Sequence, residues 1–133
     1  MSLSPDSFIR RTLLLDAAMS GACAVLLVAG AGTLAGLLGL PEDLLYTSGL
    51  VLVPFVGLLV WLMRAGSPSA IGVRAVIAIN LAWVAASAAL LISGLVDPTP
   101  FGTAFVIVQA AAVLVFAELQ IIAIRRTALP RAA

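Results

Sequence analysis

Four side chains able to do chemistry interrupt long apolar stretches of this chain: Asp16, Asn80, Trp83 and Glu118. A polar group within such a stretch usually faces protein or water, and it often marks a ligand, ion or proton pathway. A carboxylate there holds a cation or a proton, an amide donates and accepts hydrogen bonds, and an indole stacks and donates one. We therefore take these residues as candidates for ligand binding or ion coupling.

The candidates fall at similar depth along their stretches. Asp16, Asn80 and Glu118 each lie five to seven residues from an arginine, which is about 7 to 11 Å along a helix. The tryptophan follows the asparagine by one helical turn. The spacing makes a cluster of these side chains geometrically possible, with Arg11 or Arg74 as the counter-charge, but the helix order does not prove that their faces converge.

Each candidate also has a structural alternative. Asp16 can pair with an arginine or extend its carboxylate to water, and Asn80 can form an interhelical hydrogen bond. Trp83 can pack or anchor at the membrane interface. Glu118 can pair with an arginine as a structural contact, and an acid–base pair of Asp16 and Glu118 stays open. The sequence does not choose between these alternatives and the functional ones.

Three further residues are secondary polar candidates: Gln109, Gln120 and Arg74. Eleven residues separate the two glutamines, so on a helix they share a face. Glu118 is nine residues from Gln109 and points roughly the opposite way. One helix thus offers two polar faces, and lipid cannot satisfy both. This arrangement favours a homo-oligomer.

The composition indicates where these residues are held. Of 133 residues, 63% are hydrophobic and only 10% are charged, with a mean hydropathy of +1.24. A soluble domain has about 25% charged residues. The chain has too few polar groups to cover a surface in water, which indicates an integral membrane protein that has the lipid bilayer as its partner.

Four stretches are long and apolar enough to cross a bilayer, at approximately 8–38, 44–63, 73–95 and 101–124. The last would reach about 36 Å as a helix, against a hydrocarbon core of about 30 Å. The turns between them are short, so neighbouring helices should run antiparallel. The predicted fold class is all-α: an integral membrane four-helix bundle, up-down-up-down, in a single transmembrane domain over residues 1–133.

Charge predicts the orientation. All seven basic residues are arginines, and all fall at the end of the bundle that holds both termini, whereas Glu42, Asp43 and Asp97 fall at the other end. The positive-inside rule then places both termini in the cytoplasm. Arginine without lysine, together with the alanine richness, is typical of a GC-rich bacterial genome. We therefore expect a multi-pass protein of the bacterial cytoplasmic (inner) membrane.

Several classes of function are not expected. The chain has no histidine and one cysteine, Cys23, so it cannot form an intrachain disulfide, and its residues suggest no metal site. It has no basic tract of the kind that binds nucleic acid. It shows no pairing of nucleophile and base and no cofactor-binding loop, so we expect neither an enzyme nor a bound cofactor.

The segments LLLDAAMSG, GLVLVPFVGLL, VRAVIAINLAWV, DPTPFG and FAELQIIAIRR together resemble a set of small bacterial inner-membrane proteins described as uncharacterised four-helix proteins. The resemblance covers roughly residues 10–126. It implies the architecture and no activity. The chain departs from the small multidrug transporters, whose characteristic glutamate pattern in the first helix is not matched by Asp16.

Three functions remain open on this basis. The leading one is a non-enzymatic membrane protein that binds a lipid or a small amphiphilic ligand in a cytoplasm-facing cavity of the bundle. The first alternative is an oligomeric small transporter or channel that uses an intramembrane carboxylate, either Glu118 or Asp16. The second is an accessory or structural membrane subunit.

Overall fold

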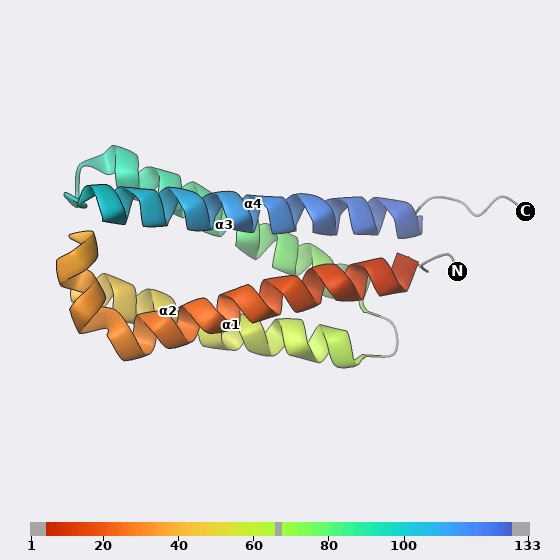
Figure 1. Ribbon diagram of the computed structural model, residues 1–133. Helices are drawn as coiled ribbons and strands as arrows, with labels where there is room; N and C mark the ends of the chain where they lie inside the picture. Colours follow the sequence, from red (N-terminus) through yellow and green to blue (C-terminus); the bar gives the residue numbers. More distant parts are fainter. Residues whose placement is uncertain (1–4, 66–67, 129–133) are drawn as a thin grey trace, which may run out of the picture.

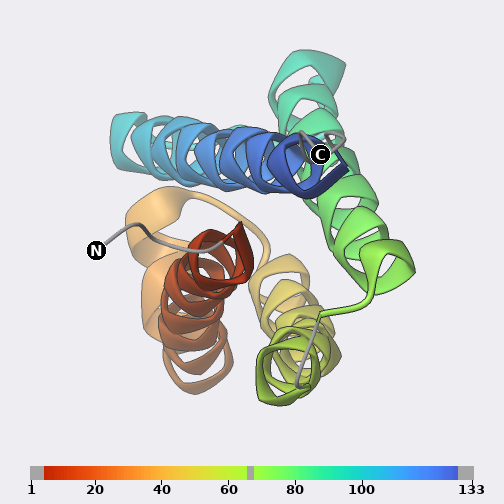
Figure 2. The same ribbon diagram turned by 90° about the vertical axis from the view of Figure 1, so that its right-hand side faces the viewer.

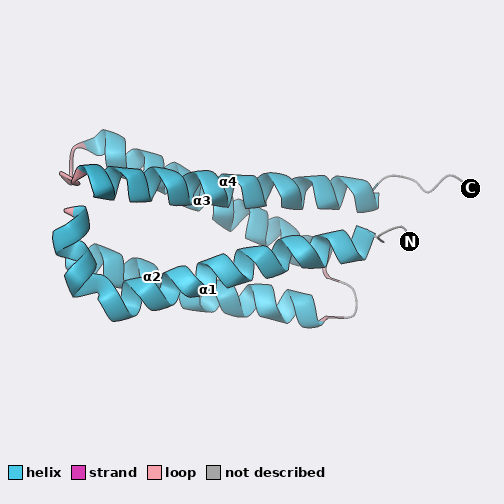
Figure 3. Ribbon diagram, viewed as in Figure 1, coloured by secondary structure: helices cyan, strands magenta, loops and turns pink. Residues whose placement is uncertain are grey.

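The computed structural model describes residues 5–65 and 68–128 (Figure 1). These residues form four α-helices and no strand (Figure 3). The helices are α1 (Pro5–Leu38), α2 (Glu42–Arg64), α3 (Ala70–Ser93) and α4 (Pro100–Ala128). The all-helical class and the four predicted stretches are confirmed. The expected single domain over 1–133 includes residues outside those described.

The helix boundaries differ from the prediction by a few residues. α3 ends at Ser93 rather than at residue 95, because Gly94 takes a left-handed conformation with φ of 74°, which glycine adopts without steric cost. α4 runs four residues past its predicted end at residue 124. α1 and α2 each begin two or three residues earlier than expected.

Thr99 links the C-terminal end of α1 to the N-terminal start of α4. Its backbone N–H donates to the Leu38 carbonyl at 2.9 Å and its hydroxyl donates to the Leu37 carbonyl at 2.8 Å. The same hydroxyl accepts from the Gly102 N–H at 3.1 Å, as a helix N-cap does. A single residue therefore satisfies orphan groups at the end of one helix and the start of another.

The four helices alternate in direction, and α1 begins at the same end of the molecule where α4 finishes (Figure 1). α1 packs along α2, α3 packs along α4, and α1 also packs against α4, whereas α2 and α3 touch only sparsely. Viewed from the end, the α1–α2 hairpin and the α3–α4 hairpin stand apart on the α2/α3 side (Figure 2). α1 and α4 are therefore in more extensive contact than α2 and α3.

α1 is not straight. Toward its C-terminal end, which holds Gly30 and Gly32, the helix bends and returns toward the start of α4 (Figure 1). Glycines lower helix stiffness and are a common cause of such bends. Before the bend, α1 is separated from the first half of α4 by a hollow. The Thr99 contacts hold the C-terminal end of α1 against the start of α4.

The outer surface of the bundle is apolar. Side chains such as Val25, Ile92 and Phe101 are well exposed, at 69%, 83% and 69%. Each helix is long and apolar enough to cross a membrane, and a water-soluble monomer rarely exposes so much contiguous apolar surface. These features suggest a multi-pass membrane protein.

The interior is packed most closely near the end that holds the start of α1. Leu13, Leu59, Leu62, Val73 and Val76 are completely buried there. Two arginines secure the same end. Arg10 donates to the Ala65 carbonyl at 2.9 Å, just past α2, and the guanidinium of Arg126 lies 4.8 Å from the centroid of the Phe8 ring. This end is therefore the more closely packed half of the bundle.

Candidate functional site

A buried carboxylate lies where three helices meet. Asp16 of α1 is fully buried. Its Oδ2 accepts hydrogen bonds from Asn80 Nδ2 of α3 and from Gln120 Nε2 of α4, both at 2.8 Å. Its Oδ1 accepts from Ser20 Oγ at 3.0 Å. We call these four residues the polar centre.

The polar centre follows from local helix geometry. Ser20 lies four residues after Asp16, so the two share a face of α1. Asn80 also donates to Gln120 Oε1 at 3.0 Å, which closes a triangle of side chains from three helices. Among the described residues, every donor to the carboxylate is a neutral side chain. A carboxylate can accept about four hydrogen bonds, so this set nearly saturates it.

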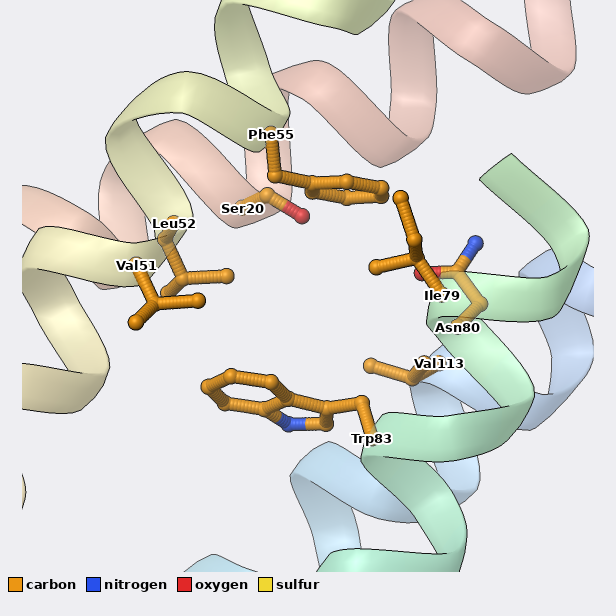
Figure 4. A pocket seen from close by; sticks show the side chains of 8 residues that line it. All are labelled: Ser20, Val51, Leu52, Phe55, Ile79, Asn80, Trp83 and Val113. Atoms are coloured by element: carbon orange, nitrogen blue, oxygen red, sulfur yellow. The ribbon is translucent and has the colours of Figure 1, made fainter. Parts of the chain in front are cut away.

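One polar atom of the centre, Asn80 Oδ1, accepts no hydrogen bond from a described residue. Both hydrogens of Asn80 Nδ2 are donated, and the Oδ1 atom turns toward a pocket between α2 and α3 (Figure 4). Asn80 is only 2% exposed, and no described residue donates to that oxygen. The polar centre therefore presents an unused acceptor to the pocket.

The pocket beside this oxygen is a narrow apolar slot, which we call the α2/α3 slot. Phe55 and Trp83 stand on opposite sides of it (Figure 4), and Ser20 and Asn80 supply its polar atoms. Its cavity volume is about 30 Å³. That space suits a water molecule rather than an organic ligand.

A second polar group lies one turn from the centre. Trp83 Nε1 donates to Gln109 Oε1 at 2.7 Å, and Gln109 Nε2 donates to Ser87 Oγ at 3.0 Å. The Ser87 hydroxyl in turn donates to the Trp83 carbonyl at 2.8 Å. These bonds fix the indole ring across the bundle interior. A cavity of about 70 Å³ adjoins them and is also lined by Cys23 and Phe105.

A larger hollow lies on the outside, between α1 and α4, and we call it the α1/α4 groove. Its volume is about 600 Å³. The bent end of α1 and the start of α4 close it at one end, and Met19 and Cys23 line its other end. Gln109 is the polar residue that lines it. Cys23, Phe105 and Gln109 also line the interior cavity, so the groove and the interior share walls.

The structure brings together some of the predicted site residues and separates others. Asp16 and Asn80 are in direct contact, and Trp83 lines the adjoining slot. Glu118 is exposed on the outer face of α4, so it does not join the cluster that the spacing allowed, and Gln120 contacts Asp16 in its place. Arg74 is exposed near the end of the bundle and gives Asp16 no hydrogen bond.

The second proposed counter-charge, Arg11, is also exposed. The shared face of Gln109 and Gln120 is confirmed, since both turn inward. Three residues at the site were not among the candidates: Ser20, which shares a helix face with Asp16 in the sequence, Phe55 and Phe105. The spacing of four between Asp16 and Ser20 was the available signal for the first. Nothing in the sequence marks the two phenylalanines.

No known protein family matches the chain, and no curated protein or solved structure matches it either. Within residues 5–65 and 68–128, no group of three or more acidic or cysteine side chains is placed to hold a metal ion. The function is therefore argued from the geometry of the chain itself.

Proposed function

We propose that the chain is a non-enzymatic multi-pass protein of a bacterial cytoplasmic membrane that binds the hydrocarbon part of a lipid or small amphiphile in the α1/α4 groove. The four apolar helices support the membrane setting. The arginines at one end and the acidic residues at the other support an orientation with both termini in the cytoplasm. The groove supports the ligand.

The size of the groove is the observation that carries this proposal. Ligand pockets occupy about 300 to 1,000 Å³, and the groove, at about 600 Å³, falls within that range. The interior cavities, at about 30 and 70 Å³, do not. We therefore propose a membrane-facing groove near the acidic end as the ligand site, in place of the cytoplasm-facing cavity that the sequence led us to expect.

The lining of the groove defines the ligand chemistry. Leucine, phenylalanine, alanine and valine side chains form its walls, and they include Leu26, Leu34, Phe101 and Val108. Such walls give no directional contact, so they select for a flexible hydrocarbon chain. Gln109 is already bonded to Trp83 and Ser87. A ligand therefore needs no strong polar group at this depth.

Filling the groove tests the proposal. Ala104 is an exposed groove residue of α4, and Ala104→Trp would occupy space that a chain needs. We expect native mass spectrometry of the protein, released from mild detergent, to show lipid retained by the wild type. We expect the variant to bind it about tenfold more weakly, equivalent to about two lost methylene contacts.

The control is Ala111→Trp, which adds the same side chain to an exposed site on the same helix outside the groove. It should leave lipid retention unchanged. Equal retention by the wild type and Ala104→Trp would contradict the proposal, as would equal loss in both variants.

A second function is favoured by the polar centre: transport coupled to a proton or cation at Asp16. The carboxylate is buried without a cationic partner among the described residues, and Asn80 Oδ1 faces the slot beside it. Asp16→Asn removes the charge at nearly constant shape. Loss of a driven flux into proteoliposomes, with the fold retained, would support this function over simple binding.

An oligomeric or accessory role rests on Glu118. Its carboxylate is exposed on α4 near the exposed apolar residues Leu114, Val115 and Ile122. A carboxylate facing lipid is costly, so a protein surface that covers it would be favoured. A second copy of the chain or a partner subunit fits this requirement, and a dimer detected in the same mass spectra would support it.

A further inference from the structure

A second hollow lies between α3 and α4 at the arginine end of the bundle. Its volume is about 250 Å³, and its walls are Arg74, Ile77, Ile121, Ile124 and Arg125. This hollow shares no residue with the α1/α4 groove. We call it the arginine cleft.

The two arginines of the cleft make no polar contact within the part of the chain that the structure describes. At the same end, Arg10 donates to a backbone carbonyl and Arg126 lies over the Phe8 ring. Arg74 and Arg125, by contrast, have no hydrogen bond, ion pair or ring contact to any described residue. Two like charges on facing helices repel each other unless an anion lies between them.

The cleft is layered along the helix axes. Arg74 precedes Ile77 by three residues on α3, so the arginine lies nearer the end of the bundle and the isoleucine deeper. On α4, Arg125 is likewise nearer the end than Ile121. An anionic group at the arginines would therefore continue into an apolar wall. This order of charge and apolar surface matches a molecule with an anionic head and a hydrocarbon chain.

We propose that the arginine cleft binds an anionic phospholipid of the surrounding membrane, with its phosphate between Arg74 and Arg125 and the start of a chain along the isoleucines. Guanidinium groups suit phosphate because they donate paired hydrogen bonds to its oxygens. The inference rests on the membrane setting proposed above, which places this end at the level of lipid headgroups. It does not depend on the α1/α4 groove.

Native mass spectrometry with added lipid tests the cleft. Purified protein in a neutral detergent is titrated separately with phosphatidylglycerol, with phosphatidylcholine and with inorganic phosphate. We expect the wild type to bind phosphatidylglycerol more tightly than phosphatidylcholine. The double variant Arg74→Gln/Arg125→Gln should lose about tenfold or more in affinity for phosphatidylglycerol, as removal of two arginines from an anionic lipid predicts. Phosphatidylcholine binding should not change.

The matched control is Arg11→Gln/Arg64→Gln, which removes the same charge from exposed arginines on α1 and α2. It should keep the preference for phosphatidylglycerol. An equal loss in both double variants would overturn the site, because net charge alone would explain it. Binding of inorganic phosphate as strong as that of the lipid would overturn the lipid as occupant.

Two further readouts separate this inference from the proposed function. Incorporation of the variants into vesicles, measured by flotation, reports on the membrane setting itself. Ala104→Trp reports on the groove and should leave the phosphatidylglycerol preference intact. A wild-type protein that inserts into vesicles but shows no preference between the two lipids would refute the cleft alone.

Discussion

Asp16 is the residue at which three of the four described helices are joined. Its two oxygens hold Ser20, Asn80 and Gln120 in fixed positions, and in lipid such contacts partly replace the hydrophobic effect as a source of helix association. The same residue could couple transport to a proton or cation. Substitutions at Asp16 measure how much its hydrogen bonds contribute to the stability of the fold.

Asp16→Ala should destabilise the fold, because the Gln120 Nε2 donor would be left buried without an acceptor. We expect a loss of about 1 to 3 kcal/mol. Asp16→Asn should cost less, since an amide oxygen can still accept from Asn80 and Gln120. Unfolding in mixed micelles of increasing dodecyl sulfate content measures both changes.

Glu118→Ala is the comparison on the exposed face, where no described residue contacts the carboxylate by a hydrogen bond or ion pair. It should not lower the unfolding midpoint of the monomer. A loss as large as that of Asp16→Ala would mean that Glu118 has a partner in the fold. That result would contradict the separation of the two carboxylates.

The choice between Glu118 and Gln120 shows what spacing can and cannot predict. Spacing correctly placed them on different faces of one helix, but it did not say which face turns inward. The inward face meets Asp16. A glutamine there donates a hydrogen bond, whereas a glutamate would bring two carboxylates together, which is unfavourable. The position of Asp16, which is 104 residues away from Gln120 in the chain, therefore favours the face of α4 that carries the glutamine.

At the scale of helices, the close approach of α1 and α2 depends on Gly49. A Cβ atom at this position would lie 2.8 Å from Val28 Cγ2 and 2.9 Å from Leu27 Cβ. Gly57 lies on the same helix with nothing within 4 Å of the equivalent point. The two glycines therefore form a matched pair for testing the packing.

Gly49→Ala should destabilise the hairpin by about 1 to 3 kcal/mol, because the added methyl group overpacks the interface. Gly57→Ala should be neutral or stabilise α2 slightly, since alanine favours a helix more than glycine does. The same dodecyl sulfate titration measures the change in stability for both variants. Similar effects of the two substitutions would show that α1 and α2 do not meet at Gly49.

At the scale of the whole molecule, the sequence predicted the number of helices and their alternation but not the hollows between them. Composition alone identifies long apolar stretches, because lipid removes the need for a polar face. The α1/α4 groove depends on the bend of α1 and on the Thr99 contacts that close its end. The Thr99 contacts join residues that are more than 60 positions apart in the chain, so local sequence patterns do not predict them.

Cross-linking with a photoactivatable acyl chain tests the central claim most directly. The wild-type protein is reconstituted with a phospholipid that carries a diazirine in its chain, irradiated, and mapped by peptide mass spectrometry. We predict that adducts concentrate on groove residues of α1 and α4, such as Leu26, Leu34 and Val108. Val53 and Ile79 are exposed residues outside the groove. If they were labelled as often as the groove residues, so that adducts followed exposed area alone, the result would contradict a bound chain in the groove.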